Sequence, residues 1–166
     1  MIKKISYLLI LLIIISCKEN RNEKEIKLEV NNLVNNWHKD VANYNFDAYF
    51  NAMTDDAIFI GTDASENWNK KAFKKFTKLH FDKRKTWNFK PLERNIYISE
   101  NGKIVWFDEL LDTWMRVCRG SGVLVKQNNA WKIKHYVLST TIPNDSMKKI
   151  VKIKALNDSV FMRKFN

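Results

Sequence analysis

The amino-acid sequence predicts a single α+β domain in which helices pack on one face of a curved antiparallel sheet. Apolar residues recur at helical spacing in the first half of the chain, up to about residue 81. Residues 87–139 instead alternate loosely between apolar and polar side chains, with turn residues between the runs. Helices followed by meandering strands are typical of this fold class, and the length suits one domain.

Three segments of the first half are expected to be helical. Residues 27–44 carry apolar side chains near helical spacing, and Asn45 ends this pattern. Residues 46–50 follow as a short second helix. The third helix is expected over residues 70–81, with Phe73, Phe76, Leu79 and His80 on or near one face.

The strands are expected mainly in the second half of the chain. Thr54-Asp55-Asp56 indicates a turn before a short buried strand at residues 57–61, and Asn101-Gly102 is typical of a hairpin turn. Gly120-Ser121-Gly122 is expected to break a strand with a bulge at a corner of the sheet, rather than to form a nucleophile turn. The expected strands of the second half cover residues 87–99, 103–118, 123–126 and 131–139. Residues 145–154 favour a closing helix, and the C-terminal tail (146–166) is expected to be loose at its end.

The N-terminus has the pattern of a bacterial lipoprotein leader. Lys3 and Lys4 precede an uncharged apolar run over residues 7–15, which is too short to cross a bilayer as a helix. The run ends in Ile14-Ile15-Ser16-Cys17, which resembles the lipobox at which a diacylglycerol is attached to the cysteine. The alternative is an ordinary secretory leader in which the cysteine is incidental.

The lipoprotein interpretation assigns the first part of the chain and its location. Residues 1–16 are expected to be a signal peptide, Cys17 the lipid-bearing residue and residues 17–26 a tether. Lys18-Glu19 does not resemble the aspartate-based signal that retains lipoproteins in the inner membrane. We therefore expect a protein of the cell envelope, held by its lipid anchor at the outer membrane.

Composition excludes several classes of function. The formal net charge is +11, but aromatic residues are not interleaved with the basic ones at stacking positions, so nucleic acid is not an expected partner. The three histidines lie far apart, and the chain has neither a CxxC nor an HExxH motif, so neither a metal nor another cofactor is expected. Cys118 is expected to be a small buried hydrophobic residue.

Several stretches, in this order, resemble the SnoaL-like branch of the nuclear transport factor 2-like superfamily. They are Asp47-Ala48-Tyr49-Phe50 with residues 54–61, then residues 61–68, and finally Arg94 with residues 105–109, 119–124, 131–133 and 142–145. The resemblance implies a cone of helices wrapped by a curved sheet over residues 27–145, with ligands held inside the open end. It also implies a homodimer through the sheet. Members of the family include isomerases, cyclases and dehydratases as well as non-catalytic binders, so the fold implies little about function.

Strand alternation selects the residues that are expected to face the inside of the cone. The lysines of the last strand are expected to face water, which turns His135 inward, and Lys103 facing water turns Asp108 inward. A bulge would instead turn Phe107 and Glu109 inward, because a slip of one residue reverses the face.

Asp108 and His135 are the candidate catalytic pair. Burial raises a carboxyl pKa and a carboxylate orients an imidazole, which together suit proton transfer. Alternatively, the two residues only satisfy each other or pair with an arginine. Six residues are candidates for ligand binding, with turn capping, core packing or internal ion pairs as their structural alternatives: Asp63, Trp68, His80, Arg94, Trp106 and Arg119.

Two functions remain open on this basis. The first is a lipid-anchored binding or accessory module whose pocket holds a small organic ligand. The second is a cofactor-free isomerase, cyclase or dehydratase that uses Asp108 and His135 as acid and base.

Overall fold

The structure of the protein is a computed structural model that describes residues 23–165. The predicted signal peptide, the lipid-bearing Cys17 and the first part of the predicted tether lie outside the described residues. Within residues 23–165, no helix combines the length and the apolar character that a membrane span requires.

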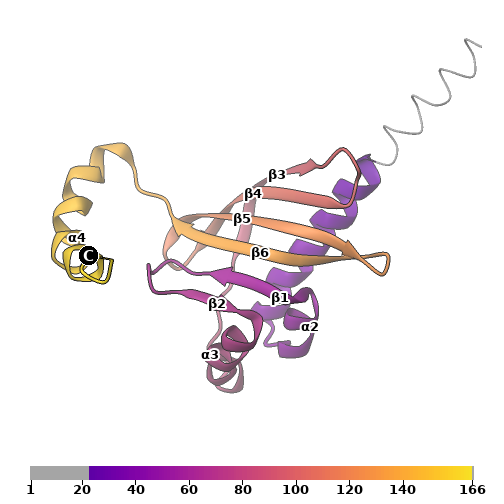
Figure 1. Cartoon of the computed structure of the whole chain (residues 1–166), viewed down its shortest axis with the longest axis horizontal. Helices are drawn as coiled ribbons and strands as arrows, with labels where there is room; N and C mark the ends of the chain where they lie inside the picture. The colour runs from indigo at the N-terminus through magenta and orange to yellow at the C-terminus, as the bar shows by residue number, and fades with distance from the viewer. Residues whose placement is uncertain (1–22, 166) are drawn as a thin grey trace, which may run out of the picture.

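Helices pack on one face of a six-stranded sheet, which confirms the predicted α+β class (Figure 1). The strand order is β2-β1-β6-β5-β4-β3, and every neighbouring pair is antiparallel except β1 with β6, which the prediction of an antiparallel sheet did not include. The elements are an N-terminal helix (residues 23–42), α2 (Phe46–Asn51), β1 (Met53–Ile60), β2 (Asn67–Asn69), α3 (Lys70–Asp82), β3 (Lys90–Ile98), β4 (Ile104–Thr113), β5 (Arg116–Gln127), β6 (Ala130–Thr140), the 3-10 turn η1 (Asn144–Ser146) and α4 (Met147–Met162).

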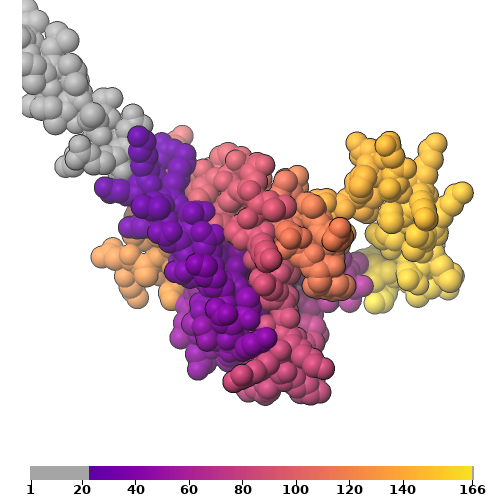
Figure 2. Space-filling model, turned by 180° about the vertical axis from the view of Figure 1, so that it is seen from behind, coloured from indigo at the N-terminus to yellow at the C-terminus, as the bar shows by residue number. Residues whose placement is uncertain are grey.

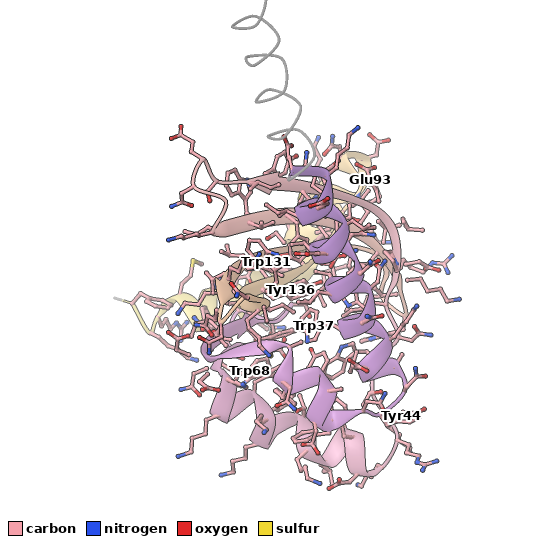
Figure 3. The ribbon with its side chains drawn as sticks, turned by 90° about the vertical axis from the view of Figure 1, so that its right-hand side faces the viewer. Trp37, Tyr44, Trp68, Glu93, Trp131 and Tyr136 are labelled. Atoms are coloured by element: carbon pink, nitrogen blue, oxygen red, sulfur yellow. The ribbon has the colours of Figure 1, made fainter. Side chains whose placement is uncertain are left out.

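The N-terminal helix covers the inner face of the sheet with one apolar stripe. Its fully buried apolar residues include Val30, Val34, Trp37 and Val41, whose spacing of three or four residues keeps them on one face. Trp37 points toward Tyr136 of β6, with 4.8 Å between the ring centroids (Figure 3). The helix already includes residues 23–26, which the sequence analysis assigned to the tether.

The first strand is longer than predicted, because the expected turn at residues 54–56 belongs to it. Thr54 is buried, and the two exposed aspartates that follow it find cationic partners outside the strand. Asp55 pairs with Lys70, and Asp56 pairs with Lys134. Polar residues that resemble a turn are therefore compatible with a strand, because lysines of neighbouring elements neutralise them.

The predicted long strand at residues 103–118 is two strands, β4 and β5, joined by a tight hairpin. Only Trp114 and Met115 lie between the paired ends Thr113 and Arg116. The Thr113 hydroxyl donates to the Arg116 carbonyl and accepts from the Met115 N–H, and Arg116 adopts a left-handed φ of 70°. This turn has no Asn-Gly or Asp-Gly pair, which is the local signal that indicates a hairpin in a sequence.

Gly120 and Gly122 lie inside β5 and do not end a strand, contrary to the prediction. A Cβ at Gly120 would lie 2.3 Å from the Tyr136 hydroxyl, and one at Gly122 would lie 2.6 Å from the Phe107 ring. Both glycines therefore make room for large side chains on the inner face of the sheet.

The C-terminal tail is helical well beyond the predicted residues 145–154. Helix α4 reaches Met162 and contains no buried residue. It forms a separate lobe beside the body of the domain (Figure 2). Among residues 23–165, all buried apolar residues lie between Ile26 and Leu138, so this core does not include α4.

We expect Gly122→Ala to lower the free energy of unfolding by about 1–3 kcal/mol, because the new methyl group overpacks the core against Phe107. Urea denaturation monitored by tryptophan fluorescence measures this change. Ser121→Ala is the matched control, since Ser121 lies on the opposite face of β5. Equal stability of Gly122→Ala and wild type would show that Phe107 is not packed there.

Candidate functional site

The inner face of β4 carries Phe107 and Glu109, which were the alternative to Asp108 as inward-facing residues. Phe107 and Glu109 are buried, whereas Asp108 between them faces outward. No register shift in β4 itself causes this. The prediction for Asp108 depends on Lys103, but Lys103 lies in the turn before β4, so its exposure says nothing about the faces of the strand.

His135 is turned outward by a bulge in β6. The pairing of β5 with β6 shifts between Val123 and Leu124, so that Lys134 and His135 both lie outside the buried alternation. Tyr136 takes the buried position after Ile133. The prediction that His135 faces the inside of the cone is therefore wrong, because one extra residue reverses the face of the rest of the strand.

Asp108 takes part in a polar cluster on the outer face of the sheet. Its carboxylate lies 3.7 Å from the Arg119 guanidinium and accepts hydrogen bonds of 3.3 Å from Asn95 and 3.4 Å from Tyr97. This contact matches the structural alternative in which Asp108 pairs with an arginine. Asp108 and His135 do not face the inside of the cone, which removes the geometric basis for the predicted acid–base pair.

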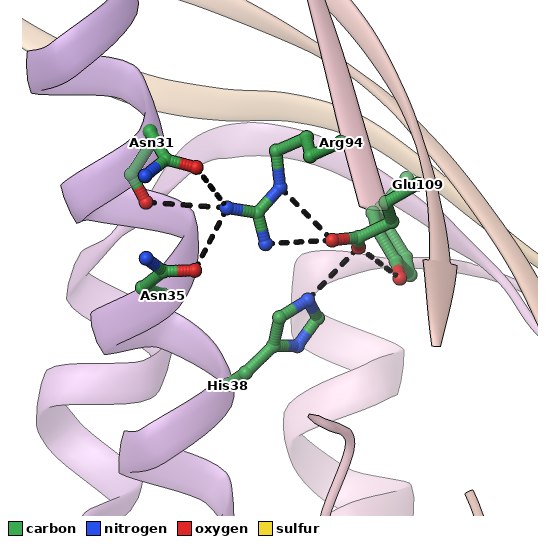
Figure 4. Close-up of polar contacts among 6 residues, drawn as sticks. Asn31, Asn35, His38, Arg94 and Glu109 are labelled. Carbon is green, nitrogen blue, oxygen red and sulfur yellow. Dashed lines mark hydrogen bonds and ion pairs between the residues drawn. The ribbon is translucent and has the colours of Figure 1, made fainter. Parts of the chain in front are cut away.

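The buried polar centre of the cone is the Glu109 carboxylate (Figure 4). Oε1 of Glu109 accepts from His38 Nε2 and from the Tyr136 hydroxyl, each at 2.9 Å. Oε2 accepts from Arg94 Nε at 3.0 Å and from Nη2 at 2.7 Å. The remaining Arg94 nitrogen, Nη1, donates to the side-chain oxygens of two residues of the N-terminal helix, Asn31 and Asn35.

This network keeps Glu109 ionised inside the core. Burial alone would raise its pKa, but the hydrogen bond and charge of His38, followed by the Arg94 guanidinium, hold the pKa of Glu109 below its ordinary value. An ionised carboxylate can only accept, so His38 Nε2 carries the shared proton. Burial raises the pKa of Tyr136 well above its ordinary value, and the Glu109 charge adds to this, so Tyr136 stays a neutral donor.

An open pocket of about 310 Å³ lies at one end of the cone, away from the buried Glu109 carboxylate. One wall is a column of four aromatic rings in the order Phe76, Trp68, Phe73 and Phe59, with successive centroids 4.6, 5.6 and 4.0 Å apart. The other apolar residues of the lining are Trp87, Phe89, Trp114, Met115 and Leu138. The lining also contains Gly61 and five polar or charged side chains, which are Thr62, Glu66, His80, Lys85 and Thr86.

A layer of aromatic rings separates this pocket from the Glu109 network. Phe89 lines the pocket and packs against the His38 ring with centroids 5.9 Å apart. Phe59 lines it as well and lies 5.6 Å from the Tyr136 ring. The side chain of Glu109 has no exposed surface. The buried network therefore supports the fold, while the pocket is the part of the cone that is open to a ligand.

The structure places only two of the predicted ligand-binding residues, Trp68 and His80, in the pocket. Asp63 closes the neighbouring β1–β2 turn, where its carboxylate accepts from the backbone and hydroxyl of Ser65. These hydrogen bonds lower the pKa of Asp63. Its position matches the structural alternative of turn capping.

The other three candidates lie outside the pocket. Arg94 forms the internal ion pair with Glu109. Trp106 stacks on Tyr97 on the outer face of the sheet, so it does not line the pocket as a ligand-binding residue would. Arg119 pairs with Asp108 on that same face. Among residues 23–165, no group of His, Cys, Asp or Glu side chains is arranged to hold a metal ion.

Sequence reasoning missed several residues that make the two sites. His38 lies next to Trp37 on the buried stripe of the N-terminal helix, and this neighbour is a signal of burial that was available. Lys85 and Trp114 lie in a loop and a turn with no periodic pattern, so no local signal assigns them to the pocket.

Sequence comparison with family models places the chain in the SnoaL-like domain family, whose model matches residues 30–143. The chain belongs to this family, and its fold is that of the nuclear transport factor 2-like superfamily. No curated protein is significantly similar in sequence to this chain.

Solved structures share the fold at low sequence identity. A candidate scytalone dehydratase from Novosphingobium aromaticivorans is 10% identical with a TM-score of 0.63, over 74% of this chain and 89% of the other. A nuclear transport factor 2-like protein of unknown function from Pseudomonas putida is 13% identical with a TM-score of 0.59, over 71% and 88%. A candidate ketosteroid isomerase from Shewanella frigidimarina is 18% identical with a TM-score of 0.54, over 65% and 92%. At these identities the similarity shows the fold alone.

We expect Glu109→Ala to lower the free energy of unfolding by about 3–5 kcal/mol, because it leaves the Arg94 charge buried without its partner. Asp108→Asn, on the outer face of the same strand, is the control and should cost less than about 1 kcal/mol. Chemical denaturation of the two variants checks this difference. Losses of equal size would contradict a special role for Glu109.

The same carboxylate predicts an acid-sensitive fold. Because the folded-state pKa of Glu109 lies below its ordinary value of 4.5, ionisation stabilises the folded protein above that pH. This stabilisation is lost as the pH falls through the folded-state pKa. As the pH falls below 4.5, the free energy of unfolding of the wild type should therefore decrease more steeply than that of Glu109→Gln. Chemical denaturation at a series of pH values measures both.

Proposed function

We propose that this SnoaL-like protein is an exported, lipid-anchored binding module whose pocket holds a small, mostly apolar ligand with a planar ring. The observation that carries the proposal is the column of stacked rings along one wall of the open pocket. Rings that stack on one another turn their edges to the side, a planar ring packs well edge to face against such edges, and a pocket of about 310 Å³ suits a ligand of one or two rings.

Charged groups at the pocket suggest how such a ligand would be oriented. His80 and Lys85 are the candidate partners of an acidic or carbonyl group, and Glu66 is the acidic residue of the lining. The Glu66 carboxylate already accepts a hydrogen bond of 3.2 Å from the Asp63 N–H at the rim of the pocket. A few polar groups in an apolar lining fix the orientation of a ligand, whereas the rings supply most of the contact area.

The catalytic alternative also moves to this pocket. A cofactor-free isomerase, cyclase or dehydratase needs an acid or base that reaches the ligand, and the structure places Asp108 and His135 elsewhere. His80 and Glu66 both line the pocket, which favours them as the residues of such a mechanism. Chemical conversion of a bound ligand that His80→Ala abolishes would establish the enzyme.

The lipid anchor remains part of the proposal on the evidence of the leader alone. An apolar run followed by Ile14-Ile15-Ser16-Cys17 provides both the export signal and the thiol that would be acylated. Two acyl chains on one residue hold a protein stably on a membrane, whereas one chain does not.

We expect Phe76→Ala to weaken binding of a planar aromatic anion, anilinonaphthalenesulfonate, by roughly tenfold, because it removes one ring of the stacked wall. Fluorescence titration of the purified domain measures the Kd. Trp106→Ala removes an aromatic ring of similar exposure on the outer face of the sheet and should leave the Kd unchanged. A loss for Trp106→Ala equal to that for Phe76→Ala would place the binding surface outside the pocket.

We expect Cys17→Ala to abolish incorporation of labelled palmitate when the full chain is expressed in a bacterial host, since the thiol is the acceptor of the diacylglycerol. Gel electrophoresis of labelled cells measures incorporation, and Cys118→Ala is the control because Cys118 is buried. Equal labelling of the Cys17→Ala chain would contradict the anchor without affecting the pocket.

A further inference from the structure

Helix α4 exposes apolar side chains that nothing in the domain covers. Val151, Ile153, Leu156 and Val160 are 59%, 64%, 76% and 53% exposed, and no residue of the helix is buried. The helix stands apart from the body of the domain over most of its length (Figure 2). Isolated exposed apolar residues are normal on a protein, but a helix with this many of them lacks the buried face that normally stabilises a helix.

Three of these residues form a stripe along one side of α4. Ile153, Leu156 and Val160 are spaced by three and four residues, so they lie above one another on the same face. We call them the α4 stripe.

The α4 stripe is bordered by cations and by no acidic residue. Its basic neighbours on the helix, three or four positions from a stripe residue, are Lys149, Lys152 and the C-cap residue Arg163, and Lys164 lies in the turn that follows the helix; all four are exposed. The only acidic residue of the helix, Asp158, lies on another face, where it pairs with Lys154 at 3.4 Å.

We propose that α4 is a docking surface for an anionic lipid membrane. An apolar stripe between cationic side chains is the arrangement with which interfacial helices insert into the headgroup region, because the basic side chains extend to lipid phosphates while the apolar ones enter the acyl boundary. Anionic headgroups complement the four cations. A second copy of this chain, with a formal net charge of +11, would instead bring like charge to the stripe.

An exposed aromatic residue lies at the same end of the domain. The Thr141 N–H and hydroxyl donate to the Val117 carbonyl, which ties the start of β5 to the segment that leads into α4. The β4–β5 hairpin that precedes Val117 carries Trp114, which is 79% exposed. Tryptophan is favoured at membrane interfaces, so an exposed tryptophan on this hairpin is compatible with a lipid surface at this end of the domain.

Vesicle co-sedimentation tests the proposal on the chain from residue 23, which contains the buried core of the described residues and lacks the predicted lipid anchor. We expect binding to vesicles that contain phosphatidylglycerol, little binding to pure phosphatidylcholine, and weaker binding at high salt. Equal binding to both kinds of vesicle, or none to either, would overturn an anionic docking surface.

Two variants and one control locate the binding on α4. Replacement of the four cations that border the stripe by glutamine should lower the binding constant by roughly a thousandfold. Leu156→Gln should also weaken binding, because it removes the most exposed stripe residue and keeps the charge. The control replaces the same number of exposed lysines on other elements, namely Lys71, Lys75, Lys83 and Lys90.

The outcomes separate the alternatives. Equal weakening by the control set would show that net charge, rather than α4, binds the vesicles, and the proposal would fall. A concentration-dependent dimer that Leu156→Gln disrupts, without vesicle binding, would assign the stripe to a second copy and also overturn it. The affinity for anilinonaphthalenesulfonate should be the same in all these variants, so the result is independent of the pocket.

Discussion

The buried Glu109 carboxylate is the interaction on which the arrangement of the domain depends. Its donors come from three separate elements, with His38 on the N-terminal helix, Arg94 on β3 and Tyr136 on β6. A buried charge that loses a partner costs several kcal/mol, so a helix placed one turn along the sheet would leave the carboxylate or the guanidinium unsatisfied. Hydrophobic burial drives the helix onto the sheet, and this network restricts where it can lie.

The network also explains why a ligand would have access to the open end of the cone and not to its polar centre. Every acceptor of Glu109 is occupied, and the rings of Phe59 and Phe89 lie between it and the pocket. The same cone is thus divided into a closed polar centre, which supports the fold, and an open aromatic pocket. This division separates the family's fold from any particular activity, since the residues that hold the helix on the sheet are not those that would meet a ligand.

Much of the fold could be predicted from local pattern. The helix at residues 70–81 was predicted to within one residue of α3, and the Asn101-Gly102 turn joins β3 to β4 as expected, with Gly102 at a left-handed φ of 64°. The candidate site could not be predicted as well. Alternation predicts that Asp108 and His135 face the inside of the cone, and both predictions are wrong. For Asp108, the lysine that sets the alternation lies outside the strand, and for His135 a bulge reverses the face.

The sequence by itself determined the fold class, the three helices of the first half and the family, and it predicts a leader from the lipobox pattern, because periodicity, turn residues and short motifs are local properties of the chain. Only the tertiary structure decided which face of each strand is inside, where the β4–β5 hairpin turns, and that Glu109 rather than Asp108 is buried. Side chains alternate with a period of two along a strand, so either face fits the same pattern equally well. The choice is made by pairing between strands that are distant in sequence, in particular by the shift of one residue between β5 and β6.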